Sequence, residues 1–283
     1  MRRQPPQAKM KTMCHFFSRL LMIPAIALGA ILAALPAHAA SSEWHENAGG
    51  RIRLVTAGQP DQNHHLQGVL EISLKPGWKT YWRDPGDSGV PPQIIPDGKY
   101  IRQANFEFPA PARHDDGYSQ WAGYDHSVLL PVRFTLGPKA RPEDLAAQVM
   151  IGICEKICIP VHASLALRPS QLSHEVVDET LVHNARAALP HPASENFGAE
   201  LVSSTDATLN VEVFLPQDAH TADLFIAGED GYVFDTPLLK NNGKKTIFEV
   251  AVIRRPAQKP SGKGVPYTLT SPQGAVSGFL PYP

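Results

Sequence analysis

Two cysteines lie four residues apart in the stretch IGICEKICIP, where Cys154 and Cys158 are flanked by isoleucines. Three kinds of chemistry suit such a pair: a structural disulfide, a disulfide that opens and closes in exchange reactions, or a set of soft metal ligands. The remaining cysteine, Cys14, lies in an N-terminal segment with the features of an export signal. A processed chain therefore keeps this pair alone.

Backbone geometry restricts how the two cysteines can meet. A straight strand holds residues four apart at roughly 13 Å, and a helix holds their Cβ atoms at about 5–6 Å, so neither suits a disulfide. Opposed residues of an antiparallel pair lie about 4.5–5.5 Å apart at Cα, which does suit one. We therefore expect a hairpin with Glu155, Lys156 and Ile157 as its loop.

The small size of the ring bears on its purpose. By the loop-entropy estimate even a ring of about 15 residues contributes only roughly 3 kcal/mol, and a shorter ring contributes less. This favours a pair that forms a mixed disulfide with a partner and then resolves it. A structural staple is the alternative, because secreted proteins also carry local disulfides.

A metal site is the third hypothesis for this stretch. Thioether, thiolate and imidazole groups suit Cu(I), and four such residues recur at intervals of four: Met150, Cys154, Cys158 and His162. On one regular strand all four would share a face, but the expected hairpin interrupts that regularity. The sequence therefore predicts no metal site and no cofactor.

Three stretches, taken in order, resemble the N-terminal domain of the thiol:disulfide interchange protein DsbD, especially the branch found in the copper-tolerance protein ScsB. They are PGWKTYWRDPGDSGVPPQ (76–93), GYDHSVLLPV (123–132) and GICEKICIP (152–160). The resemblance covers about residues 45–170. It implies an immunoglobulin-like sandwich whose cysteines relay electrons between a membrane-embedded thiol transporter and periplasmic thioredoxin-like proteins. By the same resemblance Cys158 meets partners and Cys154 resolves.

The family covers its disulfide with an aromatic ring from a loop, and here the match is less close. The corresponding stretch is RHDDGYSQWAGY, residues 113–124, and Gly117 stands where the usual aromatic would be. Tyr118 and Trp121 are the candidates to replace that ring, with ordinary packing as the alternative. Family members separate their cysteines by five residues, whereas three intervene here, so this ring is tighter.

Further residues around the pair have two interpretations each. Asp115 and Asp116 match acidic family residues near the sulfurs, where a carboxylate accepts a proton, and a solvated loop is the alternative. Three aromatics, Trp78, Tyr81 and Trp82, either fill the core or line the approach to the cysteines.

The elements that must position these residues are predicted to be strands. The chain has 27 prolines among 283 residues, and short apolar runs alternate between Gly, Pro and Asp. We expect an all-β protein with an antiparallel sandwich at residues 40–170, which the resemblance implies is immunoglobulin-like. Helical spacing predicts a linker at 171–194, and renewed strand patterns predict a second small β-sandwich domain at 195–283.

The N-terminus predicts export. Five basic residues precede an apolar run, Leu20–Leu35, which closes on AHA at 37–39, so residues 1–39 form a signal peptide by this pattern. An uncleaved anchor is the alternative. Removing this segment leaves 21 of the 26 basic residues against 27 acidic ones, a formal charge of −6. That charge argues against nucleic-acid binding.

These observations predict a periplasmic electron-relay protein, a component of a thiol-disulfide oxidoreductase system acting in disulfide reduction or cytochrome c maturation. No thioredoxin-like Cys-x-x-Cys and no further membrane segment is evident after residue 39. We expect the chain to depend on a membrane thiol transporter and a thioredoxin-like protein as partners. The alternative function is a non-catalytic periplasmic binding protein with a structural disulfide, linked to copper tolerance.

Overall fold

The computed structural model describes residues 39–283 except 87–88, 99, 116, 118, 142–143, 170–171, 217–218, 220 and 243–244. These residues belong to one compact unit, Ala37–Pro283. The predicted signal peptide lies outside the described residues apart from its last residue, Ala39. Within the described part, none of the helices combines the length and the apolar character needed to cross a membrane.

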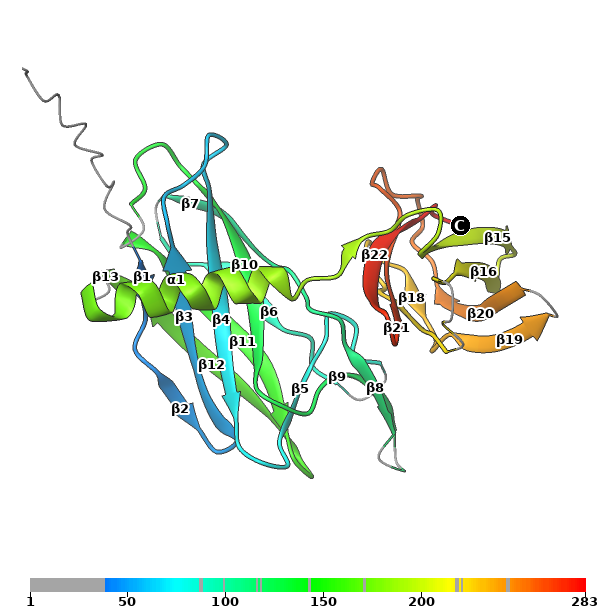
Figure 1. The fold of residues 1–283 in the computed structure, drawn as a ribbon, viewed down its shortest axis with the longest axis horizontal. Helices are drawn as coiled ribbons and strands as arrows, with labels where there is room; N and C mark the ends of the chain where they lie inside the picture. Colours follow the sequence, from blue (N-terminus) through cyan, green and yellow to red (C-terminus); the bar gives the residue numbers. More distant parts are fainter. Residues whose placement is uncertain are drawn as a thin grey trace, which may run out of the picture. The chain divides into compact units, whose positions relative to one another are not determined.

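Two antiparallel sheets build the N-terminal sandwich (Figure 1). The first contains β13 (Arg168–Pro169), β1 (Ala40–Ser41), β3 (Gly50–Ala57), β4 (His65–Leu74), β10 (Val128–Leu136) and β7 (Ile101–Phe106) in that order, with β2 (His45–Asn47) beside β3. The second contains β12 (Cys158–Ala166), β11 (Ala146–Cys154), β5 (Lys79–Tyr81), β9 (Gln120–Tyr124) and β8 (Ala112–Asp115), with β6 (Gln93–Pro96) beside β11.

The core of this sandwich follows from strand periodicity. Alternate residues of β10 point inward, and five of them are almost fully buried: Val128, Leu130, Val132, Phe134 and Leu136. β11 and β12 present the facing layer with Val149, Ile151 and Val161. The disulfide-bearing strands are therefore anchored in the core along most of their length.

One helix, α1 (Leu172–Ala187), follows the N-terminal sandwich and crosses the outer face of β3 and β4 (Figure 1). Its Val182 and Ala185 pack on Val55 and Val69, which point away from the inner core. The Arg186 guanidinium also donates to Glu107 Oε2 at 2.8 Å. The segment expected to be a helical linker is thus a helix packed on the sheet.

A second pair of sheets forms the C-terminal sandwich. The first sheet has the order β14 (His191–Pro192), β22 (Gly274–Leu280), β21 (Val265–Ser271), β17 (Asp223–Ile226). The other has β15 (Gly198–Ser204), β16 (Thr208–Phe214), β20 (Lys245–Arg254) and β18 (Val233–Phe234), with β19 (Leu238–Asn242) also beside β20. A separate apolar core lies between these two sheets.

The predicted fold class is confirmed: the chain is all-β apart from α1 and contains two sandwiches. The predicted domain boundaries at 170, 194 and 195 stay predictions. One local expectation is wrong, because much of residues 113–124 is not a loop but the hairpin of β8 and β9. Its strands are too short, and too rich in polar residues, to show a period of two.

Candidate disulfide exchange site

The β11–β12 hairpin brings the two cysteines together. Its register runs without a break from Ala146 opposite Ala166 to Cys154 opposite Cys158, which confirms the predicted loop of three residues. The cysteine Cα atoms lie 4.1 Å apart, and the sulfurs form a disulfide. The two cysteines are the last paired residues of the β11–β12 hairpin, so the strands and not the loop set the geometry of the disulfide.

The two cysteines differ in exposure. Cys154 is 1% exposed, whereas Cys158 lies on the exposed side of the hairpin. Next to Cys158, Ile157 is 77% exposed and Ile159 is 37% exposed. An incoming group therefore approaches the disulfide from the side of Cys158, across apolar surface.

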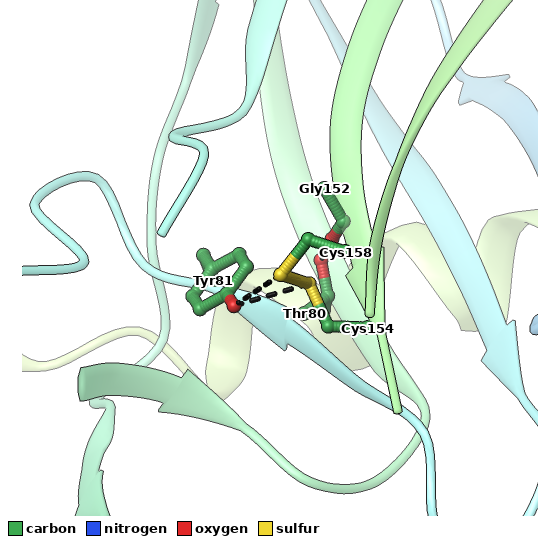
Figure 2. Close-up of a disulfide and its surroundings, with 5 residues drawn as sticks. All are labelled: Thr80, Tyr81, Gly152, Cys154 and Cys158. Atoms are coloured by element: carbon green, nitrogen blue, oxygen red, sulfur yellow. Dashed lines mark hydrogen bonds between the residues drawn. A yellow bond between two sulfur atoms is a disulfide. The ribbon is translucent and has the colours of Figure 1, made fainter. Parts of the chain in front are cut away.

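Tyr81 is the aromatic residue in direct polar contact with the disulfide (Figure 2). Its hydroxyl oxygen lies 3.1 Å from both Cys154 Sγ and Cys158 Sγ, and the residue is 2% exposed. β5 supplies it, and β5 pairs with β11 so that Lys79 lies opposite Cys154. The hydroxyl is thus placed to donate a hydrogen bond to a sulfur that becomes negative when the disulfide opens.

Two glycines make room for the Tyr81 ring. A Cβ atom at Gly152 would lie 3.1 Å from Tyr81 Cδ2 and 2.9 Å from Val90 Cβ, and one at Gly89 would lie 2.8 Å from Tyr81 Cδ1. Any larger side chain at either position would displace the ring or its neighbour. The backbone of β5 is fixed as well, because Thr80 Oγ1 donates to the Gly152 carbonyl oxygen at 2.9 Å (Figure 2).

Trp121 lies behind Tyr81 and completes a small apolar cluster with Tyr81 and Cys154. Its ring meets the Tyr81 ring edge to face, with centroids 5.9 Å apart, and it is 5% exposed. His114 stacks on the same indole at 3.9 Å, and Lys79 Nζ lies 4.3 Å from its centroid. The β8–β9 hairpin therefore supports the tyrosine that touches the sulfurs.

His114 is the titratable group in this cluster with a shifted pKa. Burial lowers the pKa of His114 below its ordinary value, because desolvation disfavours the charged imidazolium, while Asp125 acts in the opposite direction. The nearby Lys79 ammonium lowers this pKa further. His114 is therefore neutral at pH 7.

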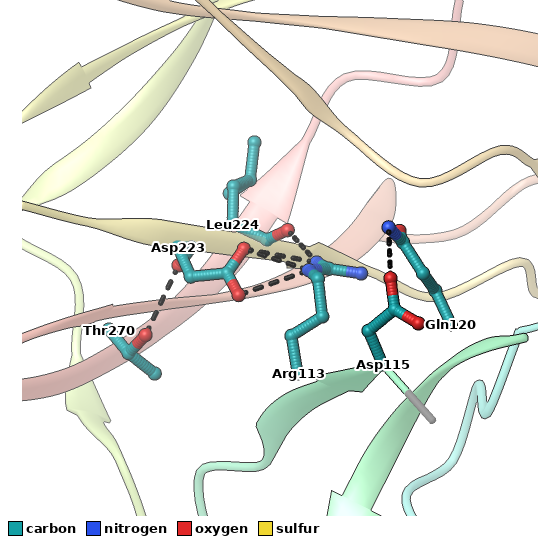
Figure 3. A network of polar contacts seen from close by, with 6 residues as sticks. All are labelled: Arg113, Asp115, Gln120, Asp223, Leu224 and Thr270. Atoms are coloured by element: carbon teal, nitrogen blue, oxygen red, sulfur yellow. Dashed lines mark hydrogen bonds and ion pairs between the residues drawn. The ribbon is translucent and has the colours of Figure 1, made fainter. Parts of the chain in front are cut away.

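The predicted acidic residues occupy the tip of the same hairpin. Asp115 is exposed, and its carboxylate accepts hydrogen bonds from the Gly117 amide at 2.8 Å and from Gln120 Nε2 at 3.4 Å (Figure 3). These bonds close the turn, which agrees with a structural role in the loop. Asp116 and Tyr118 lie outside the described residues.

The potential metal ligands separate into two pairs. Met150 lies opposite His162, and four residues further along both strands Cys154 lies opposite Cys158. At about 3.3 Å per residue the two pairs are roughly 13 Å apart, too far to share one ion. Among the described residues, no group of three or more His, Cys, Asp or Glu side chains is arranged to hold a metal.

Comparison with known proteins bears on the disulfide-bearing sandwich. Residues 52–170 match the family described as thiol:disulfide interchange protein DsbD, N-terminal. The chain carries a DsbD N-terminal domain. The resemblance read from the three sequence stretches is therefore confirmed, and the matched residues include β5, the β8–β9 hairpin and both cysteines. No curated protein matches the chain.

A solved structure shares the fold over a longer range. It is the crystal structure of the N-terminal periplasmic domain of ScsB from Proteus mirabilis, with a TM-score of 0.66 and 20% sequence identity. The alignment covers 86% of this chain and 99% of that one. The shared fold therefore extends beyond the DsbD N-terminal domain into the C-terminal sandwich.

Sequence reasoning missed part of this site. It placed Tyr81 either in the core or near the cysteines, and it did not single out His114, Gly152 or Gly89. The available signal was the motif that carries Tyr81, because Lys79 and Tyr81 alternate with Thr80 and Trp82 along the short strand β5 and the residue after it. That alternation places Tyr81 on the face opposite to the core.

Proposed function

We propose that this protein is a periplasmic thiol-disulfide interchange protein in which Cys154 and Cys158 alternate between disulfide and dithiol. The observation that carries the proposal is the asymmetric pair: an exposed Cys158 bonded to a buried Cys154, with the Tyr81 hydroxyl 3.1 Å from both sulfurs. A structural staple needs neither the exposed sulfur nor the hydroxyl.

The exchange follows from this asymmetry. A partner thiolate attacks Cys158 Sγ, the intramolecular S–S bond breaks, and Cys154 leaves as a thiolate within reach of the Tyr81 hydroxyl. A second thiol of the partner then attacks the partner's own sulfur in the mixed disulfide and releases Cys158. Two electrons and two protons reach this protein, and the reverse sequence passes them on.

The partners are a membrane-embedded thiol transporter and a periplasmic thioredoxin-like protein, in disulfide reduction or cytochrome c maturation. Membership in the DsbD N-terminal family supports this pairing. The apolar Ile157 and Ile159 beside Cys158 offer a surface for such a partner. We assign the site to residues 40–170, with 171–194 as linker and 195–283 as a second domain.

Export to the periplasm is part of the proposal. Residues 1–39 have the pattern of a signal peptide. The similar ScsB structure is described as a periplasmic domain, which supports the same compartment here. That compartment permits both disulfides and their regulated reduction.

Redox titration tests the proposed function. Equilibration of the purified protein against glutathione and dithiothreitol buffers should give a reduction potential above about −300 mV, the upper range of structural disulfides. A Cys154→Ala variant should then trap a partner through Cys158, and Cys158→Ala should not. A potential well below that value, with no trapped partner, would instead support a binding protein with a structural disulfide.

A further inference from the structure

Strand β17 of the C-terminal sandwich contributes to two cores at once. Leu224 and Ile226 are buried in the C-terminal core, whereas Phe225 and Ala227, the residue after the strand, are buried in the core of the N-terminal sandwich. Alternate residues of a strand point to opposite faces, so this division follows directly from its periodicity. β17 therefore fixes the C-terminal sandwich against the DsbD N-terminal domain.

Arg113 of β8 binds the first residues of this strand (Figure 3). Its Nε and Nη2 donate to the Asp223 carboxylate at 3.0–3.2 Å, and Nη2 also donates to the Leu224 carbonyl oxygen at 2.9 Å. The guanidinium carbon lies 4.7 Å from the Phe225 ring centroid. A planar, forked cation held by three oxygens and a ring fixes the direction of β8 as well as its distance.

β8 transmits this attachment toward the disulfide. Arg113 and His114 are consecutive residues of a strand, so their side chains point to opposite faces. On the second face His114 stacks on Trp121, which supports Tyr81 over the sulfurs. One short strand thus connects Asp223 with the aromatic cover of the disulfide.

The strand that carries Tyr81 is attached to the same region. Trp82, the residue after Tyr81, meets the Phe225 ring with centroids 5.8 Å apart. Two residues on, Asp84 Oδ2 accepts a hydrogen bond from the Gly228 amide at 2.7 Å. A small cavity of about 30 Å³ lies between these elements and is lined by Trp82, Asp84, Arg113 and Phe225.

We propose that Arg113 and Asp223 are positioning residues for the disulfide site. The C-terminal sandwich holds the β8–β9 hairpin through this ion pair, and the hairpin holds Trp121 and Tyr81 over the sulfurs. This assigns the C-terminal sandwich a role in controlling access to Cys154 and Cys158, and it rests on the proposed exchange function of that pair. Release of Arg113 should uncover the sulfurs without changing them.

The test measures access to the sulfurs in the full chain. Reduced protein reacts with a bulky maleimide, and oxidised protein is reduced by dithiothreitol, for wild type, Arg113→Gln and Asp223→Ala. Both single variants should react about tenfold faster, a ratio that corresponds to about 1.4 kcal/mol, close to the lower end of the range for a hydrogen bond to a charged group. The charge-reversed double variant Arg113→Asp with Asp223→Arg should return toward the wild-type rate, which a merely weakened fold would not do.

Glu249→Gln provides a matched control, because it breaks an ion pair of the same sandwich, with Lys240 at 3.7 Å, in the sheet that does not contain β17. Its rates should equal those of wild type. If either single variant fails to fold, Arg113→Lys serves in its place. This variant keeps the positive charge but loses the forked guanidinium, so its reaction rates should increase by less than tenfold.

Equal rates in wild type and the Arg113 and Asp223 variants would overturn the positioning role, as would faster rates that the double variant does not reverse. The reduction potential, measured on the same samples, separates this result from a failure of the proposed function. If the variants keep a potential typical of exchange proteins and their reaction rates equal those of wild type, only the positioning role is removed. A potential typical of inert disulfides removes the exchange function itself.

Discussion

The two hairpins of the site reach their structures in different ways. β11 and β12 are nine residues long each and pair over their whole length, ending at the cysteines. β8 and β9 have four and five residues, and their conformation depends on Tyr81 on one face and on Asp223 on the other. The β11–β12 hairpin, which carries the cysteines, is thus determined by its own strand pairing. The β8–β9 hairpin, which controls access to the cysteines, is held in place by contacts with neighbouring elements.

Removal of the Tyr81 ring, which lies between the two hairpins, should give the largest increase in access to the sulfurs. In Tyr81→Leu the sulfurs lose both the hydroxyl and the covering ring, and Cys154 is no longer shielded. We expect reduced protein to react with a bulky maleimide about a hundredfold faster, which corresponds to about 2.7 kcal/mol of lost protection. Tyr267→Leu, which removes a ring buried to a similar extent in the C-terminal core, is the matched control.

The companion variant Tyr81→Phe separates the ring from its hydroxyl. The ring still covers the sulfurs, so the maleimide rate should stay near that of wild type. The thiolate of the reduced form loses a hydrogen-bond donor, so the reduced form becomes less stable and the potential becomes more negative, by roughly 30 mV for about 1.4 kcal/mol. If Tyr81→Leu reacts no faster than Tyr81→Phe, the ring does not cover the disulfide.

Trp121→Leu should have an intermediate effect, because it acts only through Tyr81. An edge-to-face aromatic pair contributes about 0.5–1.5 kcal/mol beyond burial, so the maleimide rate should rise by up to about tenfold. In Tyr81→Leu the same change at Trp121 should add almost nothing, because its target ring is already gone. Independent, multiplicative effects of the two changes would show that Trp121 covers the sulfurs by itself. Melting curves of all variants exclude global unfolding as the cause.

The sequence predicts the first hairpin and not the second, for a physical reason. β-branched residues on both sides of the cysteines favour strands, and the need to join two sulfurs four residues apart selects the hairpin and its loop. In β8 the residues Ala112–Asp115 show no hydrophobic period, because Arg113 is held by Asp223, 110 residues later, and His114 by the Trp121 ring of the facing strand. Contacts of that kind leave no local pattern to read.

The same reasoning explains the partial success with the aromatic cover. The family pattern pointed to an aromatic residue from 113–124, and Trp121 does belong to the cluster. The ring that touches sulfur comes from β5, more than thirty residues earlier, because the tighter cysteine ring ends beside that strand. Pairing of β5 with β11 is a tertiary property, so no spacing within residues 113–124 reports it.

The smallest expected effect is a pH dependence of access to the disulfide, and it arises in the β8–β9 hairpin alone. The pKa of His114 is lower in the folded protein than its ordinary value of 6.5, mainly through burial. The unfolded chain therefore binds the proton first as the pH falls, so the contribution of His114 to stability is complete above about pH 6.5 and declines below it. Protonation also places a second positive charge near the Lys79 ammonium, which disfavours the charged form of His114.

We therefore expect the cover to loosen slightly in mildly acidic solution, and His114→Gln to remove that dependence. The measurement is the rate of disulfide reduction by dithiothreitol at several values between pH 5 and pH 8, expressed as the ratio of wild type to His114→Gln at each pH. The ionisation of the reagent cancels in this ratio, and so does any titration elsewhere in the chain. The ratio should rise as the pH falls below about 6.5, because only wild type gains a charge at this half-buried position. A ratio that stays constant over the whole range would mean that the β8–β9 hairpin holds Tyr81 without help from the neutral imidazole, leaving Arg113 and Trp121 as its supports.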